Sequence, residues 1–447
     1  MAPAREASGI VHVQSPSGLP ANNPNDLNPI HRVIHSLWIT ATFGPVILLL
    51  ACVDPTLPTE DDTSVVESSW LVEAEDETEV LSAFPEVDFF SEDVILPVEI
   101  DLSSSSRNAL RSNPRDYAPV DLIVGGARLE VGIRVKGSST TQSIDSKPSL
   151  KVRFDFVHPE QRFMGLRRIN LHNLTLDPIL SSEWLMWGIW RAAELPAPRV
   201  GYARLDINGD DRGLYTVVED IEDDFLQRWY EDSDGNLYEN AENYCDFTHV
   251  GCFDADEDDE GNDDALRVLI DAAALSGVAW NSAMKERMDW ELWTGFMAME
   301  RTVAHWDSYS FDLSNYRVYH EPTQDAWSFI PWSGDLGFGY RPWSYPDCGK
   351  HGVDPADHDM GLLSSGCTAD AECRDDVLDK MLVYADLIES LGGSTLVEQA
   401  LTRVRDEAET DPEHKWEMDH FDEHGACVAA FVDQRPDWVR DWVAANR

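Results

Sequence analysis

The chain is short of cationic side chains. It has 34 lysine and arginine residues against 83 aspartate and glutamate residues, a formal net charge of −49 over 447 residues. A polyanion of this strength repels DNA, RNA and anionic membrane surfaces, so we expect no nucleic acid as a partner. The charge does not indicate disorder, because 43% of the residues are hydrophobic and 16 are tryptophan, enough for a sizeable core.

The apolar run Leu37–Ala51 is too short to span a bilayer comfortably. It ends in small residues before Cys52, which is typical of a bacterial lipoprotein signal, in which the cysteine thiol takes a diacylglycerol. We therefore expect a signal segment over 1–52, an acidic flexible linker over 53–87 and a folded domain over 88–447. The expected location is the bacterial cell surface or the periplasmic face of a membrane, anchored by the lipid on Cys52. A short buried helix with an incidental cysteine is the alternative.

Six further cysteines occur after Cys52, namely Cys245, Cys252, Cys348, Cys367, Cys373 and Cys427. An even number in an exported chain suggests up to three disulfides. The first two of these cysteines, and the fourth and fifth, are close enough in the sequence to close small loops, but the pairing as a whole stays open. The chain has no CxxC pair and no Cys/His spacing typical of zinc sites, so zinc is disfavoured.

Alternating apolar and polar residues predict strands in the first half of the folded domain, and helical periodicity dominates later. The expected strands are 94–102, 129–135, 149–156, 200–205 and 214–218, with a turn at 208–211 and a hairpin over 316–331. The expected helices are 178–194, 222–230, most of 264–300 and most of 375–445. Strands first and helices later predict an α+β fold in two lobes.

Several short motifs, taken together, resemble the CotH family, the spore-coat protein H kinases. They are collinear over roughly 90–445 and include Val131–Ser139, Lys147–Phe154, Gly165–Asn173, Asp177-Pro178, Pro196–Pro198, Asn208-Gly209, Gly213–Tyr215, Gly235–Tyr238, His305–Tyr309, Asn315-Tyr316 and Ile330–Trp332 with Asp335. The resemblance implies an atypical protein-kinase-like, two-lobed fold. Its strand-rich N-terminal lobe would cover about 88–219 and its helix-rich C-terminal lobe about 220–447. It further implies transfer of a phosphoryl group from ATP to a protein serine or threonine.

Three residues are the expected centre of that chemistry. Asp307 would position the substrate hydroxyl, with Asp312 as the alternative, and Asn315 and Asp335 would bind Mg²⁺. An aspartate at a strand end before glycine can reach a Mg²⁺ ion that bridges phosphates, because Mg²⁺ favours one or two carboxylates plus phosphate oxygens.

The remaining candidates would bind the nucleotide. Lys147 or Lys151 would neutralise phosphate charge, and the sequence does not separate the two. Glu183, near the start of a helix, would hold that lysine, although a charge favoured by the helix dipole explains it equally well. Glu219, in the connector between the lobes, would lie near the adenine.

Two departures from the family pattern involve serines, and the second of them favours a rival function. Ser182 replaces a common arginine before Glu183, and Ser333 replaces the first of two acids in the segment that ends at Asp335. The rival is a non-catalytic surface or coat assembly protein that retains the fold. The acidic run 254–264 fails the calcium-loop template and is expected to be a solvated loop.

Overall fold

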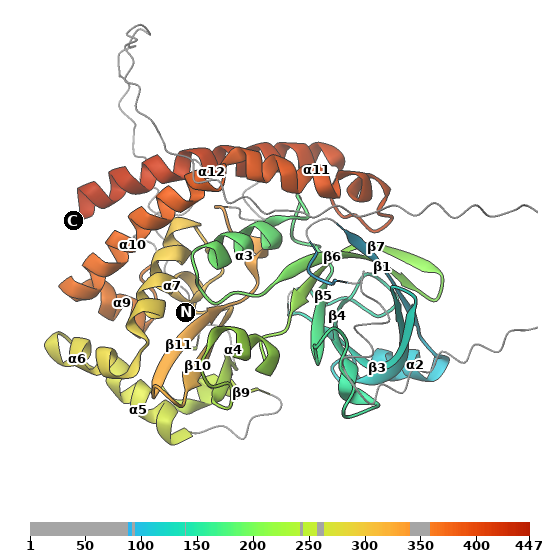
Figure 1. Ribbon diagram of the computed structural model, residues 1–447, viewed down its shortest axis with the longest axis horizontal. Helices are drawn as coiled ribbons and strands as arrows, with labels where there is room; N and C mark the ends of the chain where they lie inside the picture. Colours follow the sequence, from blue (N-terminus) through green and yellow to red (C-terminus); the bar gives the residue numbers. More distant parts are fainter. Residues whose placement is uncertain (1–87, 92–93, 139, 242–244, 257–262, 340–357) are drawn as a thin grey trace, which may run out of the picture. The chain divides into compact units, whose positions relative to one another are not determined.

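Strands dominate the described chain before residue 220 and helices dominate it afterwards (Figure 1). The computed structural model describes residues 88–91, 94–138, 140–241, 245–256, 263–339 and 358–447, all of which belong to one unit, Ser68–Arg447. The order of elements confirms the expected mixture of strands and helices. The expected signal segment, the linker, Cys52 and Cys348 lie outside the described residues.

The first strands form a closed sheet, in the order β1-β2-β3-β4-β5-β7-β6. All neighbours are antiparallel except β1 and β6, whose parallel pairing closes the sheet. Its strands are β1 (Ile95–Asp101), β2 (Ala118–Val124), β3 (Ala127–Lys136), β4 (Ser149–Arg153), β5 (Arg168–His172), β6 (Val200–Ile207) and β7 (Asp210–Glu219). Their apolar side chains form a core of their own inside this sheet.

The turn between β6 and β7 shows why the chain reverses there. Asn208 and Gly209 have φ angles of 58° and 82°, the left-handed conformation that an Asn-Gly hairpin turn needs. The Asn208 amide also accepts a hydrogen bond from Leu102 N (2.6 Å) and donates one to Leu102 O (2.8 Å). The turn is thereby attached to the end of β1.

A second, antiparallel sheet has the order β11-β10-β8-β9, and helices surround it (Figure 1). Its strands are β8 (Asn236–Asn240), β9 (Phe253–Ala255), β10 (Tyr316–Glu321) and β11 (Ala326–Pro331). The α-helices are α2 (Ser104–Ser112), α3 (Ser182–Ala192), α4 (Asp223–Trp229), α5 (Asp263–Ala273), α6 (Val278–Arg287), α7 (Trp290–Thr302), α8 (Tyr309–Asp312), α9 (Leu362–Ala369), α10 (Ala371–Ser390), α11 (Ser394–Thr410) and α12 (Met418–Asn446).

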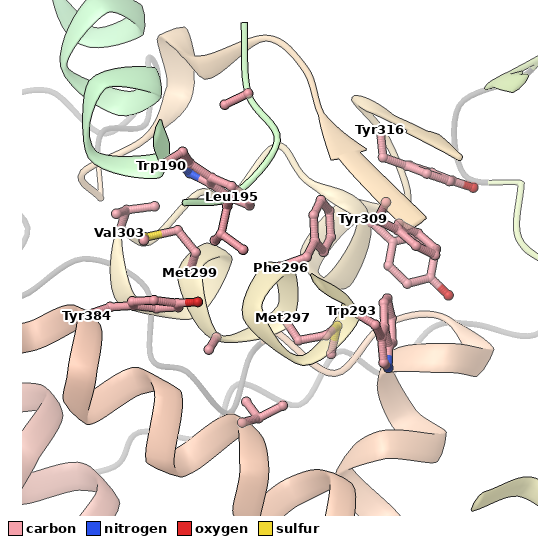
Figure 2. Close-up of a cluster of buried hydrophobic side chains, with 14 of the residues drawn as sticks. Trp190, Leu195, Trp293, Phe296, Met297, Met299, Val303, Tyr309, Tyr316 and Tyr384 are labelled. Carbon is pink, nitrogen blue, oxygen red and sulfur yellow. The ribbon is translucent and has the colours of Figure 1, made fainter. Parts of the chain in front are cut away.

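Helix α7 is the centre of the larger core. Every residue from Trp293 to Thr302 is buried, and Figure 2 shows Trp293, Phe296 and Met299 among aromatic side chains from α3, α10 and β10. A helix that is buried on all sides is expected only where neighbours cover every face. Among the helices of the described ranges, none combines the length and the hydropathy needed to cross a lipid bilayer.

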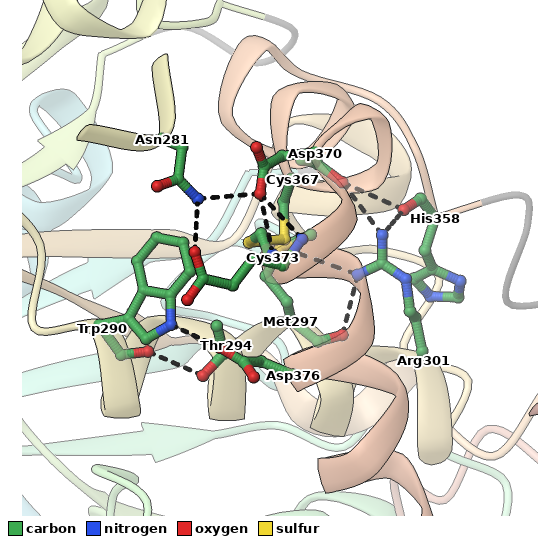
Figure 3. The surroundings of a disulfide bond; sticks show 12 residues. Asn281, Trp290, Thr294, Met297, Arg301, His358, Cys367, Asp370, Cys373 and Asp376 are labelled. Atoms are coloured by element: carbon green, nitrogen blue, oxygen red, sulfur yellow. Dashed lines mark hydrogen bonds between the residues drawn. A yellow bond between two sulfur atoms is a disulfide. The ribbon is translucent and has the colours of Figure 1, made fainter. Parts of the chain in front are cut away.

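Both pairs of cysteines that are close in the sequence form disulfides. Cys245 and Cys252 are bonded, and Cys367 and Cys373 join the end of α9 to the start of α10. Figure 3 shows the second bond beside Asp370, whose carboxylate caps α10 by accepting from Cys373 N at 3.0 Å. The expectation of disulfides is thereby confirmed, and the structure supplies the pairing of these four cysteines, which the sequence left open.

Two of the expected regions differ from the prediction. The alternation over 149–156 predicted one strand, but β4 ends at Arg153 and residues 154–156 form a 3₁₀ turn that brings Phe156 against Gly132. The helical region 264–300 is broken into α5, α6 and α7. Gly277, with a φ of 57°, is the N-cap of α6, and Asp289 is the N-cap of α7.

Candidate active site

A pocket lined by residues of both sheets gathers positive charge in this acidic chain. It has a cavity volume of about 180 Å³, and its cations are Arg115, Arg134, Lys136, Lys151 and Arg317. The other lining residues are Gly137, Asn170, Asp220, Glu239, Asp256 and Trp332. Pockets that enclose a whole drug-sized ligand measure about 300–1,000 Å³, so this one suits an anionic group such as a phosphate.

Lys151 lies in the wall of this pocket in a buried ion pair. Its ammonium group is 2.7 Å from a carboxylate oxygen of Asp220, directly after β7, and Asn170 donates to the other oxygen at 2.9 Å. Burial acts against both charges, yet their attraction prevails: the pKa of Lys151 is raised, and the pKa of Asp220 is lowered by Lys151 and Arg317. The pair is therefore ionised.

A second lysine connects the pocket to the helix α3. Lys136 Nζ lies 2.6 Å from His172 Nε2, and His172 Nδ1 lies 2.9 Å from Glu183 Oε2. Glu183 also accepts hydrogen bonds from Thr216 (3.3 Å) and from the Trp187 indole (3.4 Å). The chain of contacts joins a pocket cation to a buried carboxylate through one imidazole.

Burial sets the charge of this chain of contacts. It lowers the pKa of Lys136 to about 7, although Asp220 and Glu183 act in the opposite direction. Burial would raise the pKa of Glu183, but His172 and Lys136 outweigh it, and the net shift is downward. Glu183 is thus an anion, while Lys136 titrates near neutral pH.

Asp335 lies next to Glu183, in the 3₁₀ turn Gly334–Leu336 that follows β11. The pKa of Asp335 is raised, first by burial and then by the negative charge of Glu183. Its carboxylate accepts a hydrogen bond from Ser333 Oγ at 2.8 Å. A buried carboxylate and a half-buried one that repel each other are a donor set that a bound cation would stabilise.

Asp307 precedes α8 and is close enough to Asp335 to be affected by its charge. Burial raises the pKa of Asp307 to about 6, the hydrogen bond from Ser314 Oγ (3.0 Å) lowers it, and the charge of Asp335 raises it further. The Asn315 amide donates to the backbone carbonyl of Asp307 at 2.9 Å. The three residues expected at the centre of the chemistry therefore occupy one region.

His305 holds the segments of Asp307 and Asp335 together. Its Nε2 donates to Ser333 O at 3.1 Å, and its ring contacts Trp187 edge to face. Burial lowers the pKa of His305 to about 4, so its ring is neutral at physiological pH. A neutral ring between two loops acts as a structural hydrogen-bond donor.

Two predicted residues lie elsewhere. Lys147 forms a buried ion pair with Asp411 (2.6 Å), which follows α11, and does not line the pocket. Glu219, the last residue of β7, is buried between Arg199 (2.8 Å) and Arg228. Of the two lysine candidates, Lys151 lines the pocket and Lys147 does not, and Asp220 lines it next to the predicted Glu219.

A comparison with protein-family models gives a match to the CotH kinase protein model over residues 133–439, more than half of the chain. The chain belongs to this family. The CotH resemblance of the sequence motifs is thereby confirmed.

Two known proteins are similar to this CotH family member. The inner spore coat protein H of Bacillus subtilis (strain 168) is 20% identical over 347 residues, which cover 73% of this chain and 91% of that protein. The crystal structure of the Helicobacter pylori proinflammatory kinase CtkA gives a TM-score of 0.32 with 8% identity, covering 66% of this chain and 93% of that one.

The departures from the CotH pattern have local explanations. Ser333, in place of an acid, has a left-handed backbone (φ of 55°) and donates its hydroxyl to Asp335. Ser182, in place of an arginine, donates its backbone N–H and its hydroxyl to the two oxygens of Asp177 (2.7 and 2.8 Å). Both serines stabilise a neighbouring carboxylate.

Some residues of this CotH site were not singled out from the sequence. Arg134 and Lys136 are two apart on β3, so they point to the same side, and the alternation of that strand was the available signal. His172 and Trp332 lie within the motifs Gly165–Asn173 and Ile330–Trp332, but their contacts, like those of Arg317, depend on partners in other elements. The acidic run 254–264, expected to be solvated, contributes Asp256 to the pocket, 3.6 Å from Arg317; residues 257–262 lie outside the described chain.

Proposed function

We propose that this chain transfers the γ-phosphoryl group of ATP, with Mg²⁺, to a serine or threonine hydroxyl of a protein. One observation carries the proposal: contacts from Lys136 through His172 join a cationic pocket to the buried Glu183, whose charge raises the pKa of the half-buried Asp335, and the charge of Asp335 in turn raises the pKa of the half-buried Asp307. Phosphoryl transfer asks for this combination of cationic cover, metal ligands and one carboxylate near the attacking oxygen.

In this proposal each side chain has a distinct role. Lys136 and Lys151 face the phosphates, and Glu183 keeps Lys136 in place through His172. Asp335 and Asn315 hold Mg²⁺, which would neutralise the charge that develops on the transferred group. Asp307, with a pKa of about 6, accepts a hydrogen bond from the substrate hydroxyl and takes its proton. Ser138 and neighbouring backbone amides would cover the phosphates, as the chain has no GxGxxG or Walker A motif.

The test measures phosphate incorporation into protein and the thermal shift caused by ATP with Mg²⁺. We expect Asp335→Asn to lose the Mg²⁺-dependent shift and to lower transfer by about a hundredfold or more. Glu398→Gln, on the exposed face of α11, serves as the matched control and should behave like the wild type. Failure of the wild type to bind ATP with Mg²⁺ and to label any protein would contradict the proposal.

The proposal includes a two-lobed arrangement, with lobes over about 88–219 and 220–447, and a lipid anchor on Cys52 that places the domain outside the cell. The short apolar segment before Cys52 supports the anchor, and the name of the Bacillus subtilis relative supports a surface or coat location. Detection of peptides from residues 1–30 in the mature protein would contradict the anchor.

Ser333 favours a second function. Because a serine replaces a possible metal ligand there, the fold could serve as a non-catalytic surface or coat assembly protein, in keeping with the name of the relative. Restoring the acid separates the two functions. Ser333→Asp should raise phosphate transfer if the site is a weakened kinase, and should change nothing if the site has no catalytic role.

A further inference from the structure

The connection between β8 and β9 brings three metal-binding side chains together, apart from the candidate active site. One ligand atom from each of Cys245, His249 and Cys252 lies within 4.8 Å of the others. His249 Nδ1 is 3.0 Å from Cys252 Sγ, while the two cysteines are joined as a disulfide. The spacing of these residues is not typical of zinc sites, so the cluster arises from the way the connection folds back on itself.

The donor types and their positions suit zinc once the disulfide is open. Zinc takes thiolates at about 2.3 Å and imidazole at about 2.0–2.1 Å in a tetrahedron, which places two ligand sulfurs about 3.8 Å apart. The Cα atoms of the two cysteines are 5.3 Å apart, so rotation of the side chains can give this separation. His249 is exposed, so solvent reaches the cluster and a water molecule can supply the fourth ligand.

We propose that Cys245, His249 and Cys252 bind a zinc ion in the reduced protein, in place of the disulfide. A thiol reductant gives two electrons and two protons to the disulfide, which becomes two thiols while the reductant is oxidised to its own disulfide. When zinc binds, both thiols lose their protons to solvent, and neutral His249 donates its Nδ1 lone pair.

The site holds a segment that contacts the start of α8, which follows Asp307, and the start of α9. The Asp246 carboxylate accepts hydrogen bonds from the Tyr309 hydroxyl (3.2 Å) and from Leu362 N (2.7 Å). Phe247 is fully buried, and its ring lies 5.9 Å from that of Tyr309. The disulfide and the zinc ion are thus alternative closures that keep Asp246 and Phe247 in place, one under oxidising and one under reducing conditions.

The test is a titration of the purified chain with Co²⁺, a spectroscopic substitute for zinc, before and after reduction by a phosphine. We expect a thiolate-to-cobalt charge-transfer band only after reduction, and displacement of Co²⁺ by Zn²⁺. His249→Ala keeps both thiols and should bind Co²⁺ at least about tenfold more weakly. The double variant Cys245→Ser/Cys252→Ser should lose the band.

The other disulfide provides the matched control. Cys367→Ser/Cys373→Ser removes the same number of cysteines from α9 and α10 and should keep the band. Far-UV circular dichroism follows the fold in each sample. The proposal is overturned if the reduced wild type shows no band, if the band survives in Cys245→Ser/Cys252→Ser, or if reduction unfolds the chain and Co²⁺ does not restore it. None of these readouts depends on kinase activity.

Discussion

His172 can connect Lys136 to Glu183 in one protonation arrangement. With Nδ1 protonated, the ring donates to Glu183 and its Nε2 accepts from the Lys136 ammonium group. A second proton on the ring would place two donors against each other at 2.6 Å. In this arrangement the contact needs the charge on Lys136, whose pKa burial lowers to about 7, and it is therefore sensitive to pH.

The rate of phosphate transfer should have a bell-shaped pH profile. It should rise through about pH 6, as Asp307 loses its proton, and fall above about pH 7, as Lys136 loses the charge that attracts phosphate. Lys136→Arg keeps the cation at every accessible pH, so it should move the falling limb upward. The measurement is kcat/KM for ATP against pH in both proteins. If the falling limb is unchanged in Lys136→Arg, the group that causes the fall is not Lys136.

For individual site residues, the sequence predicted the residue type better than the residues with which each one interacts. Asp307, Asn315 and Asp335 could be predicted because each lies in a motif of the family. The choice between Lys147 and Lys151 could not be made, because it depends on Asp411 and Asp220, which lie on distant parts of the chain. Pairings of this kind follow from tertiary packing and leave no local pattern.

Among the helices, glycine makes close contacts possible. Gly366 of α9 lies against the buried indole of Trp280 in α6, where a Cβ would be 2.5 Å from the ring. Gly188 of α3 has no atom near its own Cβ position. A change to alanine therefore meets a neighbouring side chain at Gly366 and none at Gly188.

Gly366→Ala should lower the free energy of unfolding by about 1–2 kcal/mol, because overpacking outweighs the gain in helix propensity. Gly188→Ala, the matched variant, should raise it by up to about 1 kcal/mol, since only the propensity changes. Urea denaturation of both variants measures the difference. If both changes stabilise the protein, the contact between α6 and α9 is looser than described.

Most elements could be predicted from periodicity, and their pairing could not. The alternation predicted β1, β3, β4, β6 and β7 to within a few residues. It missed α2, whose sequence is mostly serine and charged residues with Leu110 as its buried apolar side chain. It also gave no sign that β5 pairs with β7, because pairing across an intervening helix and strand is a property of the tertiary fold.

For the molecule as a whole, a net charge of −49 surrounds a pocket that concentrates cations. The long-range field repels a nucleotide, while the buried cations attract its phosphates at short range. Salt screens the first effect more than the second, since buried charges are shielded less than exposed ones.

Association of ATP should therefore accelerate with salt, by about two- to tenfold between low and high NaCl, and should need a divalent cation. Stopped-flow measurements with a fluorescent ATP analogue give the association rate, and omission of Mg²⁺ gives the metal dependence. A control titration with an uncharged nucleoside should show no change with salt. Binding of the analogue without any divalent cation would mean that Asp335 is not a metal ligand.

The parallel pairing of β1 with β6 has a consequence for the order of folding. Ile95 pairs with Tyr202, so the first strand waits for a partner that is synthesised long after it. Until β6 arrives, one edge of β1 is unpaired, and such edges are prone to join other chains. A nascent chain that is truncated before Val200 should accordingly remain dependent on chaperones, whereas one that extends past Glu219 contains every strand of the closed sheet.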